Sequence, residues 1–277
     1  MVMHRPTRNR RRIPPTAQFG LAVIALFCAI ALFAPLIAPF GETQIVGSEF
    51  APWGGKHLLG TDNLGRDMAT RLIYGARNTI GIAVITTVLA FLVGGALGMI
   101  AGTLRGWIDQ LLSRFVDIMM AVPSLIFTLL LLSIFGTSIT SMIVVIAAVE
   151  ATRIYRLARS LALGISVMDY VEAARLRGEG LAWLVLREIL PNSTAPMIAE
   201  FGLRFCFVFL FIASLSFLGL GIQPPTADWG SMVRENAALI TYGDITPLLP
   251  AGATALLTVA VKFIVDWMLH RSSGLKD

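Results

Sequence analysis

The sequence predicts an all-α, polytopic membrane protein with six transmembrane helices. Of its 277 residues, 56% are hydrophobic and only 14% are charged, and the mean hydropathy is +0.77. Soluble domains carry about 25% charged residues, so this much apolar surface needs a bilayer to cover it. Six apolar segments are long enough to cross a hydrocarbon core of roughly 30 Å as helices. They cover residues 19–40, 79–102, 112–135, 138–158, 194–218 and 247–269.

Basic residues predict the orientation of these segments, because cytoplasmic flanks of membrane proteins are rich in Lys and Arg. With the N-terminus inside, 15 of the 22 Lys and Arg residues lie in or beside cytoplasmic segments and five lie outside, while Arg204 and Lys262 lie at membrane depth. Both termini are therefore predicted to be cytoplasmic. The basic tail has no interleaved aromatic residues and no nucleic-acid-binding motif accompanies it, so no nucleic acid is expected as a partner.

The predicted organisation has five parts in chain order. They are a basic cytoplasmic tail (1–18), a first span (19–40), an extracytoplasmic loop with an amphipathic segment (41–77), a five-helix core (78–270) and a second cytoplasmic tail (271–277). The basic start and Ala29-x-Ala31 resemble a cleaved signal peptide. However, the apolar run continues to Phe40, and the predicted orientation works with this segment retained.

Ionisable residues inside spans are candidates for function, because placing them in hydrocarbon is costly. Glu200 and Arg204 are four residues apart in the fifth segment, and Lys262 and Asp266 have the same spacing in the sixth. Each pair therefore shares a helix face and can neutralise itself. We expect either buried ion pairs or the polar lining of a translocation path.

Glycine and proline residues in the spans predict local packing and local bends. Gly94, Gly98 and Gly102 form a series of small residues on one face of the second span, which permits close contact with another helix. Pro123 and Pro196 predict kinks or local adjustments in the third and fifth spans.

The chain carries no catalytic or nucleotide-binding pattern. His4, His57 and His270 lie outside the spans, and no H-E-x-x-H, G-x-S-x-G or P-loop sequence occurs. Cys28 and Cys206 lie singly in apolar segments, without the spacing of metal ligands. We therefore expect no enzyme activity, metal or cofactor in this chain. Any ATP and Mg²⁺ would be bound by another chain.

A polar segment, residues 164–191, separates the fourth and fifth spans on the predicted cytoplasmic side. Asp169 and Glu172 have the spacing of a capping box, with Asp169 as the N-cap. Gly178 predicts a left-handed helix stop, and a second helix is expected from about Leu181 until Pro191. On physical grounds this compact pair of helices either docks on another protein or lies on the lipid surface.

The same segment resembles the EAA loop of ABC-importer permeases. The matching residues, with three residues and then ten between the groups, are Glu172, Ala173 and Ala174, then Gly178, then Ile189, Leu190 and Pro191. "GTDNLGRDMATRLIYGAR" (60–77) and "SLSFLGLGIQPPTADWGSM" (214–232) resemble segments of the dipeptide/oligopeptide/nickel permease family. The chain is thus similar, over about residues 15–270, to the C-type subunit of such a permease pair.

The chain departs from that family's pattern at two places. Glu179-Gly180 follows Gly178 where relatives often have a small residue and then Ser or Thr, and a glycine caps a helix slightly more weakly than a hydroxyl does. In the last span, Lys262 stands where relatives commonly carry an uncharged residue, and Val265 where many have glycine. These differences bear on the substrate and leave the class unaffected.

The resemblance implies a type I ABC-importer permease fold in a bacterial inner membrane, working by alternating access. The loop 164–191 would be the coupling helix that seats in a groove of an ATPase subunit. The implied partners are a homologous second permease, two ABC ATPases that bind ATP and Mg²⁺, and an extracytoplasmic solute-binding protein. Di- or oligopeptides are the expected substrates, and opines, nickel chelates or another small solute are the alternatives. An ion-coupled transporter or channel is a more remote alternative.

The outer segments 41–77 and 219–246 would form the docking surface for the binding protein. Candidate docking residues are Trp53, Asp62, Arg66, Asp67 and Trp229. For the two tryptophans, a place in the aromatic belt at the membrane interface is the alternative.

Overall fold

The computed structural model describes residues 13–273. The predicted tail residues up to Arg12, which include its five arginines, lie outside the described residues, as do residues 274–277. Helices make up about three-quarters of the described chain, and within it the only strand-like pairing is three isolated β-bridges between residues 45 and 67. The all-α class predicted from the sequence is confirmed.

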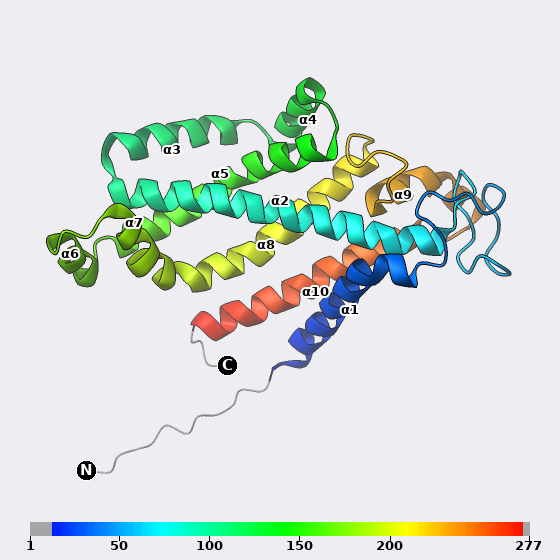
Figure 1. The fold of residues 1–277 in the computed structure, drawn as a ribbon, viewed down its shortest axis with the longest axis horizontal. Coiled ribbons are helices and arrows are strands. Elements are labelled where there is room, and N and C mark those ends of the chain that lie inside the picture. Colours follow the sequence, from blue (N-terminus) through cyan, green and yellow to red (C-terminus); the bar gives the residue numbers. More distant parts are fainter. Residues whose placement is uncertain (1–12, 274–277) are drawn as a thin grey trace, which may run out of the picture.

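Ten α-helices, one π-helix (η1) and one 3₁₀-helix (η2) follow one another within residues 13–273 (Figure 1). In chain order they are α1 (Pro15–Ile37), α2 (Met68–Leu104), α3 (Gly106–Ala121), α4 (Ser124–Phe135), α5 (Ile139–Ile165), α6 (Asp169–Leu176), α7 (Leu181–Trp183), η1 (Leu184–Ile189), α8 (Leu190–Phe217), α9 (Trp229–Asn236), η2 (Ala237–Tyr242) and α10 (Leu248–Ser273).

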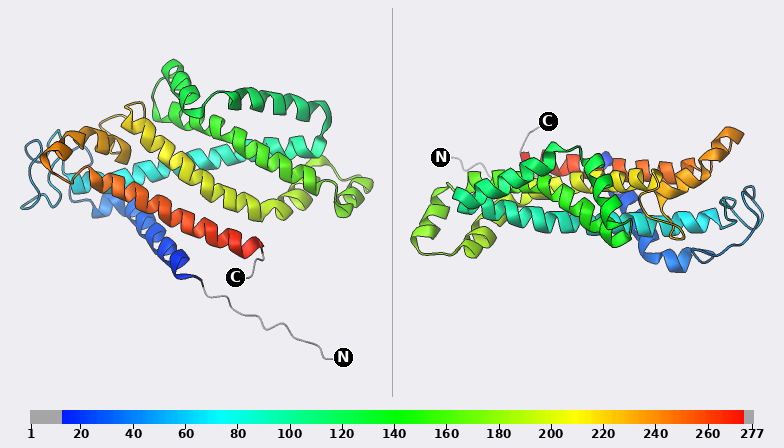
Figure 2. Two further views of the ribbon diagram at one scale, coloured as in Figure 1. Left: turned by 180° about the vertical axis from the view of Figure 1, so that it is seen from behind. Right: turned by 90° about the horizontal axis from the view of Figure 1, so that it is seen from above.

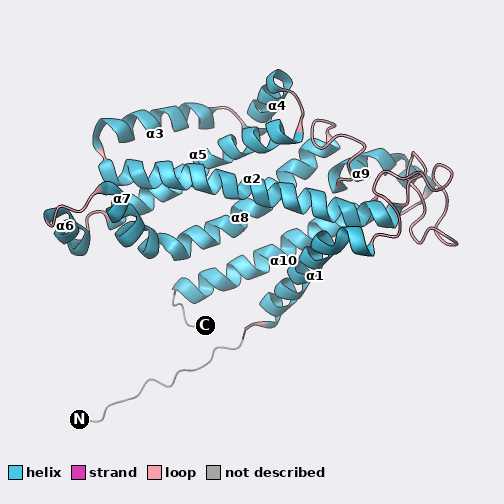
Figure 3. Ribbon diagram, in the orientation of Figure 1, coloured by secondary structure: helices cyan, strands magenta, loops and turns pink. Residues whose placement is uncertain are grey.

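The molecule is elongated, and its long helices run roughly along its length (Figure 1). The predicted coupling segment, with α6 and α7, lies at one end, and the loop before α2 lies with α9 at the other (Figure 1). Irregular chain is concentrated at the end that carries this loop (Figure 3). The two segments for which the sequence predicts opposite sides of the membrane are therefore at opposite ends of the bundle.

The predicted number of spans is only partly matched. Within the described residues, four helical runs are long and apolar enough to cross a membrane: α1, α2, Leu181–Phe217 and α10. The bent pair α3 and α4 would add a fifth. The predicted span 138–158 lies in α5, which has 27 residues but carries Glu150 and three arginines. Its charge, not its length, keeps α5 below the apolarity of a lipid-facing span.

The predicted span 112–135 is not one helix. It consists of α3 and α4, which are bent by 93° at the break between them. Pro123 lies in that break, where it has no N–H to donate and disfavours helical geometry at Val122. The expected kink is therefore a complete break. By contrast, α8 continues through Pro196.

The glycine series in α2 lies against α5. A Cβ atom added at Gly94, Gly98 or Gly102 would lie within 2.6 Å of a backbone carbonyl oxygen of α5. Such separations are shorter than any Cβ contact allows, so the two helices approach as closely as they do because these residues are glycine. On the other side of α2, α1 and α10 run side by side (Figures 1 and 2).

Candidate functional site

The coupling segment is a capped helix followed by a turn. In α6, the N–H of Gly178 donates to the carbonyl of Arg175 (2.9 Å) and that of Glu179 donates to the carbonyl of Ala174 (3.2 Å). With φ of +84° at Gly178, this is the Schellman arrangement, and the predicted left-handed stop is confirmed. The predicted capping box is wrong. Met168, whose side chain makes no cap hydrogen bond, is the N-cap, and Asp169 is already the first helical residue.

The second helix of this segment does not end at Pro191 as predicted. From Leu181 the chain passes through α7 and η1 into α8 without interruption, and Pro191 lies in the first turn of α8, where a missing N–H is tolerated. The part of the coupling segment that follows the turn at Gly178 is thus the first part of one helical rod, Leu181–Phe217. π-Helical turns are rare and often occur at functional positions.

The residues of the EAA pattern divide into a buried and an exposed set. Ala174 and Ile189 are fully buried, and Ala174 packs with Val171 and Leu184. A guanidinium N–H of Arg175 donates to the carbonyl of Thr103 at the end of α2 (3.1 Å), which ties α6 to the bundle. Glu172, Ala173 and Pro191 are exposed, and Leu190 is half-buried.

Apolar side chains around α6 are also exposed. Leu176 is 85% exposed, and Val167, Met168 and Tyr170 are exposed in the same segment. Glu172 and Ala173 lie among them in sequence. Exposed apolar side chains gathered on a projecting, well-anchored helix are typical of a protein–protein contact surface.

A second group of polar residues joins α5 and α8 near the middle of the bundle. The predicted Glu200–Arg204 pair forms, with 2.6 Å between Glu200 Oε1 and Arg204 Nε. Arg204 also contacts Glu150 (3.2 Å), and Glu150 in turn contacts Arg153 (3.0 Å). These four residues are called the midspan network below. The pair predicted from spacing is thus half of a larger network whose other half comes from α5.

The other predicted pair does not form. Lys262 and Asp266 lie one turn apart on α10, but no ion pair joins them in the part of the chain that the structure describes. Lys262 is exposed and Asp266 is half-buried. Spacing by four residues places two side chains on one face but does not fix their rotamers, and a self-contained pair gains little free energy.

Three polar contacts hold α3 against α5. The guanidinium of Arg159 binds both carboxylate oxygens of Asp109, with 2.7 Å between Nη2 and Oδ2. Ser113 shares a hydrogen bond with the Tyr155 hydroxyl (3.0 Å). Asp117 and Arg156 form an ion pair (2.6 Å). A hollow of about 310 Å³ opens along this seam, lined by Ser113, Val116, Asp117, Tyr155, Arg156 and Arg159.

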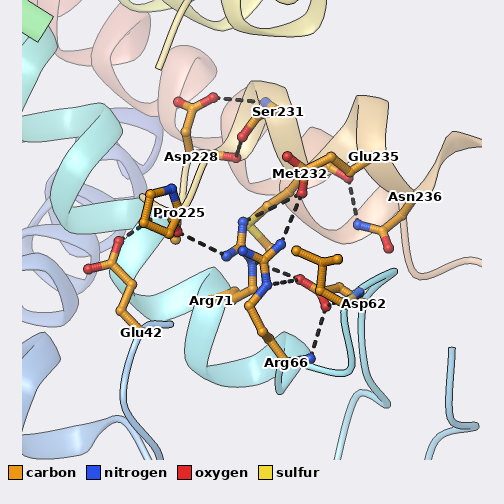
Figure 4. Close-up of polar contacts among 12 residues, drawn as sticks. Glu42, Asp62, Arg66, Arg71, Pro225, Asp228, Ser231, Met232, Glu235 and Asn236 are labelled. Atoms are coloured by element: carbon orange, nitrogen blue, oxygen red, sulfur yellow. Dashed lines mark hydrogen bonds and ion pairs between the residues drawn. The ribbon is translucent and has the colours of Figure 1, made fainter. Parts of the chain in front are cut away.

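A third group of charged residues lies at the opposite end of the molecule, and its side chains are buried from solvent. Asp62 Oδ2 contacts Arg66 Nε (2.6 Å) and Arg71 Nε (3.2 Å), while Glu235 Oε2 contacts Arg66 Nη2 (3.3 Å) and Arg71 Nη2 (3.6 Å) (Figure 4). These four residues are called the loop cluster below. None of their side chains is more than 9% exposed.

The loop cluster joins three segments of the chain. Asp62 also accepts hydrogen bonds from the backbone N–H groups of Leu64 and Arg66 (2.9 Å each), and Arg71 donates to the carbonyl of Pro225 (3.3 Å) (Figure 4). The loop before α2, the start of α2 and the segment around α9 are thereby fixed to one another. Opposite charges in equal number let the cluster stay buried.

Most of the predicted docking residues are buried. Asp67 accepts a hydrogen bond from the backbone N–H of Thr70 (2.8 Å), which caps α2, and contacts His57 (3.1 Å). Trp229 is 1% exposed and donates from Nε1 to the carbonyl of Leu72 (3.0 Å). Asp62 and Arg66 belong to the loop cluster. These four side chains hold the fold together and do not themselves present a docking surface.

Trp53 differs from those four residues. It is 42% exposed, and its Nε1 donates to the Thr246 hydroxyl (2.7 Å). Tyr242, Ile245 and Leu248 in the segment that it contacts are exposed. An apolar surface thus remains at this end, although it is built from residues that the sequence did not single out.

Asp228 is the buried N-cap of α9. Its carboxylate accepts hydrogen bonds from the backbone N–H of Ser231 (2.8 Å) and from the hydroxyl of Thr79 (3.0 Å). Burial raises the pKa of Asp228 above its ordinary value, and the donated hydrogen bonds oppose that shift. This cap links the segment after α8 to α2.

Two family profiles match the chain. The first, described as binding-protein-dependent transport system inner membrane component, matches residues 94–273. It includes the coupling segment, the midspan network and the loop-cluster residue Glu235. The second, described as the N-terminal TM domain of oligopeptide transport permease C, matches residues 14–52.

The chain belongs to the binding-protein-dependent transport system inner membrane component family. Members are the membrane permease subunits of ABC transporters, in which a separate subunit is the ATPase. This permease is accordingly an integral inner-membrane protein and not an enzyme.

Curated relatives cover nearly the whole permease. It is 35% identical over 260 residues to the dipeptide transport system permease protein DppC of Alkalihalophilus pseudofirmus, covering 93% of this chain and 83% of that one. It is 38% identical over 266 residues to the di/tripeptide transport system permease protein DppC of Pseudomonas aeruginosa, covering 93% and 85%.

A solved structure has the same fold. The chain of an amino acid ABC transporter, crystallised with histidines, aligns with a TM-score of 0.54 over 73% of this permease and 94% of that chain. At 19% sequence identity this likeness concerns the fold alone.

Proposed function

We propose that this permease is the translocation subunit of an ATP-driven importer of di- and oligopeptides. Its relatives named above are dipeptide and di/tripeptide permeases, and the similarity covers more than nine-tenths of the chain. The proposed assembly contains a homologous second permease, two ABC ATPases and an extracytoplasmic solute-binding protein. ATP and Mg²⁺ are bound by the ATPases, and this chain holds no cofactor.

The coupling segment carries this proposal. Glu172 and Ala173 are exposed at one end of the bundle, on a helix that Arg175 and the buried Ala174 anchor. After the turn at Gly178 the chain runs from Leu181 into α8 without a break, and Ala174 of α6 packs against Leu184 of this rod, so a push on α6 from an ATPase is passed to the rod through that contact. In the proposed cycle, closure of the ATPases around ATP moves this end and opens the far end.

The proposed orientation places α6 and both termini in the cytoplasm. The loop before α2 and the segment around α9 then face the binding protein. Trp53 and the exposed apolar residues Tyr242, Ile245 and Leu248 are the proposed contact surface there. The loop cluster beneath keeps this surface in one shape.

Charge reversal at Glu172 tests the proposed coupling. In the complete complex reconstituted in liposomes, Glu172→Lys should abolish the stimulation of ATP hydrolysis by loaded binding protein, because it places a cation on the docking face. The chain should still insert and assemble with the second permease. Stimulation at the level of the unchanged complex would refute the proposal.

A matched glycine pair tests whether the shape of α6 matters. Gly178 has φ of +84°, whereas Gly180 has φ of −78° and open space around an added Cβ. Gly178→Ala should weaken the helix stop by about 1–2 kcal/mol and lower stimulated ATP hydrolysis, because an L-residue is strained in that conformation. Gly180→Ala should change neither. Equal effects of the two substitutions would show that the stop has no role in coupling.

A further inference from the structure

Six charged side chains on α3, α5 and α8 form a stripe near the middle of the bundle. The stripe consists of the midspan network together with the pair Asp117–Arg156. Arg153 lies 14 residues from the start of α5 and 12 from its end, and Arg204 lies 14 and 13 residues from the ends of α8. Both positions lie about 20 Å, at 1.5 Å per residue, from the helix ends that point away from the coupling segment, so Arg153 lies deeper in the bundle than the count of basic residues predicted.

The stripe is open on one side. The side chains of Arg156, Asp117 and Arg153 are 54%, 52% and 37% exposed. Side chains at such a depth cannot face hydrocarbon with their charges uncovered. The lipid-facing surface of the same region is different, because α3 exposes Trp107, Leu111 and Ile118 on the side away from α5. One face of α3 and α5 is therefore suited to lipid and the other to water.

Two further features lie on the charged side. The hollow of about 310 Å³ between α3 and α5 is lined by both members of the Asp117–Arg156 pair. The break between α3 and α4 adjoins the midspan network, since Arg153 Nη2 lies 3.5 Å from the Ser124 hydroxyl. Irregular backbone at membrane depth is tolerated where it lines a water-filled cavity or is covered by protein.

The charges of the stripe balance. It contains three arginines and three acids, and every acid is paired with an arginine at 3.2 Å or less. A lining with an excess of one sign would hold solutes of the opposite sign tightly and repel the others. A balanced lining with both signs partly exposed offers an ammonium group and a carboxylate comparable, weak contacts. A peptide, which carries both at its ends, is the solute that matches this pattern.

We propose that the stripe lines the water-filled translocation path and gives transient contacts to the charged termini of the peptide in transit. Arginine side chains, Arg153 foremost, contact the carboxylate, and Glu200 contacts the ammonium group. This inference rests on the proposed function as a peptide importer. It adds Asp117, Glu150, Arg153 and Arg156 to the path, and leaves out Lys262 and Asp266.

The test compares peptides that differ only in charge. The complete complex is reconstituted in liposomes, and ATP-driven uptake of Ala-Ala-Ala, Ala-Glu-Ala and Ala-Lys-Ala is measured with saturating, peptide-loaded binding protein. Arg153→Gln leaves the stripe with one excess negative charge. Uptake of Ala-Lys-Ala should then rise and that of Ala-Glu-Ala should fall by about fivefold each, the effect of one charge some 8 Å away at an effective dielectric constant of about 40, so their ratio should rise about 30-fold.

Glu200→Gln should shift the same ratio in the opposite direction by a similar factor. The double variant Glu150→Gln with Arg153→Gln restores balance and should return the ratio to its starting value. Lys262→Gln is the matched control, because it removes a positive charge from α10, a helix that contributes no residue to the stripe. It should leave the ratio unchanged.

Opposite shifts for the two single variants are expected only if the peptide passes within reach of the stripe. A common loss of uptake for all three peptides, or an unchanged ratio, would overturn the inference and would mean that the second permease covers these residues or that they only hold the fold. If the unchanged complex takes up none of the three peptides, the proposed function itself fails, and this inference fails with it.

Discussion

The loop cluster and the midspan network contain the same types of charged residue but differ in how far their side chains are exposed to solvent. Each contains two arginines and two acids in alternating contact, at 2.6–3.6 Å in the first and 2.6–3.2 Å in the second. In the loop cluster no side chain is more than 9% exposed. In the midspan network Glu200 is 19% and Arg153 is 37% exposed.

The difference follows from how many segments enclose each group. The loop cluster is enclosed by three segments, namely the loop before α2, the first turn of α2 and the segment around α9 that includes Pro225 (Figure 4). The midspan network is held by α5 and α8, and Ser124 of α4 contacts it on a third side. A sealed group of charges can only stabilise or destabilise its own chain, whereas an open group can also meet a solute or a partner.

The largest loss of stability is expected in the loop cluster. Asp62→Ala leaves two buried guanidinium groups with one carboxylate, and should lower the free energy of unfolding by about 3–5 kcal/mol. Thermal unfolding of the purified full-length chain in detergent measures the loss. Glu49→Ala, an exposed acid in the same loop, is the control and should change stability by less than about 0.5 kcal/mol. Similar stability of the two variants would show that the loop cluster is not structural.

An intermediate loss of stability is expected at the contact between α2 and α5. Gly98→Ala places a Cβ about 2.5 Å from the carbonyl oxygen of Tyr155, so the helices must separate and the free energy of unfolding should fall by about 1–3 kcal/mol. Gly81→Ala on the same helix meets no atom within 4 Å and should be neutral or slightly stabilising. Because α5 carries half of the midspan network, only Gly98→Ala should also reduce transport. Equal stability of the two variants would contradict the packing described for α2 and α5.

The smallest effect on stability is expected at the open group. Glu200→Gln keeps a hydrogen-bond acceptor for Arg204 and lies partly in solvent, so it should cost less than about 1 kcal/mol in the same unfolding measurement. Its effect on the charge preference of transport should nevertheless be clear. A loss as large as that of Asp62→Ala would remove the distinction between the two groups, and would mean that the midspan network is sealed in the assembled transporter.

Sequence and structure agree best where the information is local. The helix stop at Gly178 and the Glu200–Arg204 pair depend on residues within one or two turns, and both are confirmed. The capping box at Asp169 is also a local pattern but is wrong, since the helix begins one residue earlier than the spacing implied. The Lys262–Asp266 pair failed because spacing places side chains on a face without fixing their contacts.

The rest of the candidate sites could not be found in this way. Arg66 and Glu235 are 169 residues apart, and no local pattern connects them. In the sequence, Arg71 has no distinguishing feature beyond being one of the five basic residues predicted to lie outside the membrane. Glu150 and Arg153 could have been noticed as charged residues inside the predicted span 138–158. Nothing in the sequence of that span, however, shows that Glu150 contacts Arg204 of another helix.

By itself, the amino-acid sequence determined the class of this protein, its apolar segments and the polar loop with the EAA pattern, because span length, helix stops and motif spacing are properties of contiguous residues. Tertiary structure alone decided which charges are enclosed and which stay open. Burial depends on how many segments pack around a group of side chains: three enclose the loop cluster, whereas α5 and α8 hold most of the midspan network. The same types of charged residue thus brace a loop at one end of the permease and form an open stripe at its middle.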